Sequence, residues 1–99
     1  MALEHEAQLR QELERGRLAQ DVLDNPIYQE AVAALRQQIM TQWSDSPARD
    51  TEGRERLWTM LKFLENLAGQ LESVMQTGKM ASITLEQKRT LADRVRNWL

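Results

Sequence analysis

The sequence has no cysteine, and this absence removes several kinds of chemistry. Without a thiol, the chain cannot form a disulfide, use a thiolate nucleophile or bind zinc through sulfur. Its single histidine, His5, stands between Glu4 and Glu6, and no second histidine follows at Leu9 to complete a metalloprotease motif. We therefore expect His5 to be a solvated surface residue, and we expect no Ser–His catalytic pair.

Glycine is also scarce, and the apolar runs are short. The four glycines, Gly16, Gly53, Gly69 and Gly78, are isolated from one another, so the chain has no glycine-rich phosphate loop. No apolar stretch approaches the roughly 18 residues that span a bilayer, and no secretory signal is visible. These features predict a soluble protein that is cytoplasmic when made and has no membrane partner.

Acidic residues occur in pairs, but the pairs do not predict acid–base catalysis. Such catalysis needs a carboxyl whose pKa is shifted by burial or by a close like charge. The pairs are expected on polar helix faces or at helix caps: Glu12 with Glu14, Asp21 with Asp24, and Asp50 with Glu52. We therefore predict no catalytic residue, no metal, no cofactor and no small-molecule substrate, and hence a protein that is not an enzyme.

The chain is 99 residues long and is expected to form a single helical domain. Its net charge is only −2, which gives no general reason to bind nucleic acid. The charges are nevertheless uneven, with six acidic and three basic residues in 1–27 but five basic and two acidic residues in 79–99. Complementary ends of this kind can attract each other within one subunit or between neighbours.

The residues that are present predict four helices, at about 3–24, 26–43, 50–77 and 84–98. Apolar residues spaced three or four apart give residues 50–77 a broad apolar face. Asp24-Asn25-Pro26 predicts a break at which Asp24 or Asn25 caps the second helix, and Asp50 or the Ser46-Pro47 pair can begin the third. Thr77-Gly78 predicts a stop, residues 79–83 a connection, and Thr84 the cap of a last helix. The predicted fold is all-α, with an antiparallel hairpin of helices 26–43 and 50–77 flanked by the first and last helices.

The predicted interaction residues lie mainly outside this hairpin. Residues 1–24 can form an extended arm whose narrow seam of Leu9, Leu13 and Leu23 packs on another subunit. Trp58 lies beside the main apolar sector of its helix, and Trp98 lies at the edge of the apolar face of the last helix, so both are candidate partner contacts. A DNA-binding role would instead use the basic residues of the last helix: Lys88, Arg89, Arg94 and Arg96.

An ordered set of short motifs gives the chain a family resemblance across residues 14–81. The motifs are Glu14-Arg15-Gly16, Ala19, Val22-Leu23-x-Asn25-Pro26, Leu35, Trp43, Arg54-Glu55-x-Leu57-Trp58, Lys62 and Gly78-Lys79-Met80-Ala81. This pattern resembles small uncharacterised helical proteins encoded among the head and packaging genes of tailed bacteriophages and prophages. The resemblance implies a virion component or an assembly factor, made in the cytoplasm of a host cell, and it implies no catalytic residue.

The leading hypothesis is therefore a non-enzymatic structural or assembly protein of a phage particle, acting through helix–helix contacts in a homo-oligomer or with other phage proteins. Two alternatives stay open. One is a DNA-binding packaging subunit similar to a small terminase, and the other is a phage-encoded adaptor or inhibitor that binds a host protein through Trp58.

Overall fold

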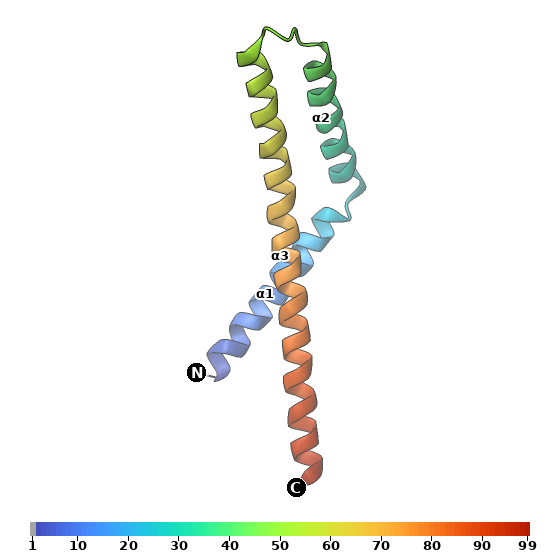
Figure 1. The fold of residues 1–99 in the computed structure, drawn as a ribbon. Helices are drawn as coiled ribbons and strands as arrows, with labels where there is room; N and C mark the ends of the chain where they lie inside the picture. The colour runs from blue at the N-terminus through green and yellow to red at the C-terminus, as the bar shows by residue number, and fades with distance from the viewer. Residues whose placement is uncertain (1) are drawn as a thin grey trace. The chain divides into compact units, whose positions relative to one another are not determined.

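The computed structural model describes residues 2–99, with side chains from Leu3 onward. Within this range the chain forms three α-helices and no strand (Figure 1). They are α1 (Ala2–Leu23), α2 (Pro26–Asp45) and α3 (Thr51–Trp98). The all-α prediction is confirmed, but the prediction of four helices is wrong.

Side-chain caps set the helix boundaries on either side of α2. The side-chain oxygen Oδ1 of Asn25 accepts hydrogen bonds from the backbone N–H groups of Ile27 at 2.8 Å and Tyr28 at 3.3 Å, and Pro26 occupies the first turn of α2. At the start of α3, a carboxylate oxygen of Asp50 accepts a hydrogen bond from the Gly53 N–H at 3.0 Å. The breaks predicted at Asp24-Asn25-Pro26 and before Asp50 are thus confirmed, and each depends on a capping side chain.

The predicted stop at Thr77-Gly78 does not exist, because α3 is continuous through residues 77–84. The connection at residues 79–83 and the separate last helix are wrong for the same reason. Gly78 does not adopt the positive φ that a left-handed helix cap requires. The Thr84 hydroxyl, predicted as a cap, instead donates to the Met80 carbonyl at 3.0 Å inside the helix.

The chain divides into two compact units, each of which includes part of α3. One unit comprises the chain up to Asp21 together with Glu72–Leu99. In this unit α1 crosses α3 at two glycines (Figure 1). A Cβ added to Gly16 would lie 2.6 Å from the Cα of Gly78, and a Cβ added to Gly78 would lie 3.0 Å from the Glu12 carbonyl oxygen. Gly78 therefore permits close packing of two helix backbones rather than ending a helix.

The other unit, Val22–Leu71, has a small core between α2 and the first part of α3. Ile39 of α2 and Leu57 and Leu64 of α3 are buried, and Val32 and Leu61 pack against them. The broad apolar face predicted for residues 50–77 is therefore only partly covered. Leu57 and Leu64 lie inside, whereas Leu67 on the same helix is exposed.

Candidate interaction surfaces

An exposed apolar stripe runs along the first part of α3. Met60, Phe63 and Leu67 are spaced three and four residues apart, which places them on one side of the helix. All three are exposed, and Phe63 keeps 76% of its surface accessible. The sequence reading missed Phe63 because the apolar sector was centred on the buried Leu57 and Leu64. The spacing of Phe63 from Met60 and Leu67 is the signal that could have found it.

The two tryptophans of the Val22–Leu71 unit line an apolar pocket of about 210 Å³. Its walls are formed by Ile39, Met40, Trp43, Leu57, Trp58 and Leu61. Trp58 is 60% exposed, consistent with its predicted position outside the main apolar sector. Trp43 is also exposed.

Two cations border this tryptophan pocket. The guanidinium of Arg54 lies 4.0 Å from the centre of the Trp43 ring, and the Lys62 ammonium lies 5.6 Å from the centre of the Trp58 ring. Arg54 also donates a long hydrogen bond of 3.5 Å to the Ser46 carbonyl. The pocket therefore offers an apolar floor with positive charge beside each aromatic ring.

The last turns of α3 are uncovered on every side. All residues from Arg89 to Leu99 are exposed, and Trp98 keeps 92% of its surface accessible. Leu91, Val95 and Leu99 are exposed with it. Trp98 and its apolar neighbours are thus free to contact another molecule.

The four basic residues proposed for DNA binding do not form one strip. At about 100° per residue, Arg89 and Arg96 lie within about 20° of each other around α3. Arg94 lies about 140° or more from both, so it is on a different side. Arg96 is also paired with Asp93 at 2.6 Å, whereas Lys88 is half-buried.

The three residues of the predicted α1 seam differ in exposure, and they are divided between the two units, with Leu23 in the Val22–Leu71 unit. Leu9 is only 7% exposed, so its own chain already covers it. Leu23 is half-buried and Leu13 is exposed. Of the three seam residues, Leu13 is the one left exposed for another subunit.

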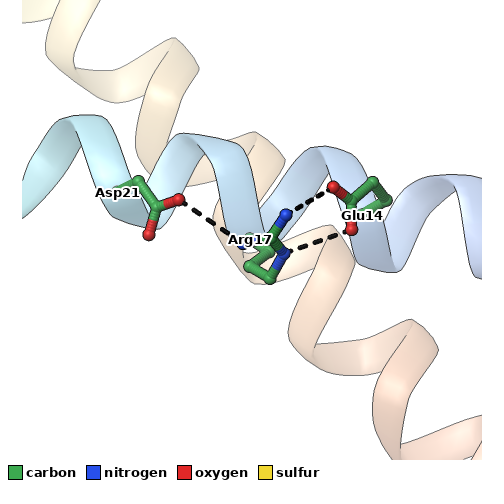
Figure 2. A network of polar contacts seen from close by, with 3 residues as sticks. All are labelled: Glu14, Arg17 and Asp21. Carbon is green, nitrogen blue, oxygen red and sulfur yellow. Dashed lines mark hydrogen bonds and ion pairs between the residues drawn. The ribbon is translucent and has the colours of Figure 1, made fainter.

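Ion pairs lie on exposed helix faces, as Figure 2 shows for Glu14, Arg17 and Asp21 of α1. The Arg17 guanidinium donates to both carboxylate oxygens of Glu14, at 2.7 and 3.1 Å, and lies 3.7 Å from Asp21. Hydrogen bonding from Arg17 lowers the pKa of Glu14, and the same contact raises the pKa of Arg17. The network is local, because its members are three and four residues apart on one helix, and it suits helix support rather than proton transfer.

Residues 2–99 contain neither of two features that would indicate another kind of site. No group of three or more acidic or histidine side chains is close enough together to hold a metal ion. None of the three helices contains an apolar stretch that could cross a bilayer. The surfaces on which this part of the chain offers distinctive chemistry are the exposed apolar ones described above.

Comparisons with other proteins add no relative: no family model, no curated protein and no solved structure matches the chain.

Proposed function

We propose that this chain is a non-enzymatic assembly protein whose exposed apolar faces are covered by helices of other copies. One observation carries the proposal. Among the described residues, 18 large apolar side chains are exposed, whereas six hydrophobic residues are buried, two of which are alanines. Exposed contiguous apolar surface marks contact sites in soluble proteins, because burying it is favourable.

Within this proposal, α2 and the first part of α3 act as an antiparallel hairpin that presents the tryptophan pocket and the Met60–Leu67 stripe. The acidic start and basic end of the chain set the register between subunits. The family resemblance of residues 14–81 supports assignment of this assembly to a phage particle, as a virion component or an assembly factor made in the host cytoplasm.

Size-exclusion chromatography with light scattering tests the proposal over a range of protein concentrations. We expect a mass well above the 11.5 kDa of one chain, rising with concentration. A mass of 11.5 kDa at every concentration would reject assembly of this chain with itself.

A DNA-packaging subunit is the second candidate, favoured by the exposure of Arg89, Arg94 and Arg96. Binding through these residues would release counterions and weaken steeply with salt. Fluorescence anisotropy with labelled duplex DNA should then show binding at low salt that Arg89→Ala reduces. Absence of binding at low salt removes this candidate.

An adaptor for a host protein is a third candidate, favoured by the pocket beside Trp43 and Trp58. Aromatic residues in such pockets often dominate binding energy. Capture of a host protein should be lost in Trp58→Ala and retained in Trp98→Ala. Equal capture by both variants would exclude this pocket as the contact.

A further inference from the structure

The end of α3 carries an apolar stripe with positive charge along both of its edges. Leu91, Val95, Trp98 and Leu99 fall within a sector of about 100° around the helix. Arg94 lies about 40° beyond one edge of this sector, and Arg96 lies about 60° beyond the other. Asp93 is the one acidic residue in 87–97, and it lies on the opposite side of the helix.

The start of α1 carries the complementary pattern. Leu3 and Ala7, both exposed, lie about 40° apart on one side of the helix. Glu6 lies about 60° beyond Leu3, and Glu4 lies about 60° beyond Ala7, on the other edge. Glu6 is half-buried and forms an ion pair at 3.8 Å with Arg10, which lies about 20° from Leu3 on the same edge. Glu4 is therefore the exposed carboxylate that borders this apolar pair without a basic neighbour in residues 3–9.

These two surfaces do not cover each other within one unit. The helices α1 and α3 cross at Gly16 and Gly78 and diverge from there (Figure 1). Leu91 and Leu99 lie 13 and 21 residues beyond Gly78, which is roughly 20 and 32 Å along the helix. Accordingly Leu3 remains 81% exposed and Trp98 92% exposed.

We propose that the start of α1 from one copy packs on the end of α3 of the next copy. Apolar contacts would form between Leu3 and Ala7 of one chain and Leu91, Val95 and Trp98 of the other. Glu4 and Glu6 would pair with the arginines along the edges. This proposal rests on the proposed function, because it names the surfaces through which the copies associate.

The charges favour a second copy in this head-to-tail arrangement over a symmetric pairing of two α3 ends. Two α3 ends would bring together like charges from Lys88, Arg89, Arg94 and Arg96, which is unfavourable. An acidic α1 start neutralises them instead. Because the two contacting surfaces differ, a pair of copies still has one free α1 start and one free α3 end. Further copies can add at these ends, until the assembly closes into a ring or extends as a filament.

Charge reversal tests the contact directly. One variant carries Glu4→Lys with Glu6→Lys, which also removes the Glu6–Arg10 ion pair. A second carries Arg94→Glu with Arg89→Glu, which lies within about 20° of Arg96 around the helix and leaves the Arg96–Asp93 ion pair intact. We expect each variant alone to associate at least tenfold more weakly than the wild type, measured by sedimentation velocity. An equimolar mixture of the two should regain assembly, because each basic surface then meets an acidic one.

Matched controls change the net charge equally at exposed positions elsewhere. Glu30→Lys with Glu55→Lys and Arg36→Glu with Arg49→Glu should assemble as the wild type does. Recovery in the mixture also shows that both reversed variants are folded. Failure of the mixture to recover, or undiminished assembly of the Arg89→Glu/Arg94→Glu variant alone, overturns the head-to-tail contact while leaving self-assembly in place. A wild type that stays at 11.5 kDa instead overturns the proposed function and this contact together.

Discussion

At the scale of single residues, Gly16 and Gly78 decide how closely two helices pack. Glycine in a helix interior costs about 1 kcal/mol relative to alanine, so each needs a compensating contact. The backbone of Gly78 lies within 2.6 Å of where a Gly16 Cβ would be. Side chains there would push the backbones apart, and nearby Leu9, Ala19 and Ala81 would lose part of their cover.

Replacing either glycine with alanine should therefore destabilise the fold. We expect Gly16→Ala and Gly78→Ala to lower the free energy of unfolding by about 1–3 kcal/mol, the usual cost of overpacking. Gly69 provides the control, because nothing lies within 4 Å of an added Cβ, and Gly69→Ala should gain up to about 1 kcal/mol. Urea denaturation followed by circular dichroism measures all three. Equal stability of Gly78→Ala and Gly69→Ala would contradict the close approach.

The Glu14–Arg17 contact predicts a direction of pH dependence. Because the folded pKa of Glu14 lies below its ordinary value of 4.5, folding weakens proton binding to this carboxyl. Its contribution to stability is therefore complete above pH 4.5 and is lost as the pH falls through the lowered pKa. Glu14→Gln should slightly lower the melting temperature at neutral pH and should match the wild type in strong acid.

The effect should be small, since this pair is fully exposed and screened by solvent. Glu30→Gln is the control, because Glu30 forms no ion pair within residues 2–99. A Glu14→Gln difference that persists unchanged in strong acid would contradict the assigned contact.

At the scale of helices, the sequence predicts the boundaries that are set by capping side chains close to them in the chain. Asn25 and Asp50 cap the helices that follow them, and both boundaries were predictable from the capping residues and Pro26. Gly78 and Thr84 carry equally good local signals for a helix stop and a helix start, yet α3 passes through both. The deciding contact joins Gly78 to Gly16, which is 62 positions earlier in the chain, and no local pattern contains that information.

The residues of the candidate interaction surfaces could likewise be predicted only in part from the sequence. Trp58 and Trp98 could be singled out because they lie off or at the edge of an apolar sector, and both are exposed. Leu9 and Leu13 share one seam in the sequence, but only Leu9 is buried. Which of two neighbouring leucines is covered depends on the angle at which α1 crosses α3, and helical periodicity does not specify that angle.

Continuity of α3 can be checked residue by residue. Because α3 is one helix spanning Thr51–Trp98, we expect the Cα and carbonyl chemical shifts of residues 77–84 to have helical values throughout. Random-coil shifts at residues 79–83 would restore the connection that the sequence predicts. Circular dichroism gives an independent check, because helices of 22, 20 and 48 residues correspond to about nine-tenths helix.

At the scale of the whole molecule, the chain exposes more large apolar side chains than it buries. Ten of the 18 exposed ones lie at the end of α3, along its first part and around the tryptophan pocket. Helices of this kind gain most of their stability from packing against other helices. Association of copies would thus stabilise each chain as well as join it to its neighbours.

Hydrogen–deuterium exchange of the α3 end tests most directly whether other helices cover these surfaces. Peptides spanning residues 85–98 are compared across protein concentrations, with residues 26–38 of α2 as an internal reference. The account predicts that protection of residues 85–98 rises with concentration and that Leu91→Ser with Trp98→Ser abolishes the rise. Fast exchange of these amides at every concentration, while assemblies are present, would contradict it.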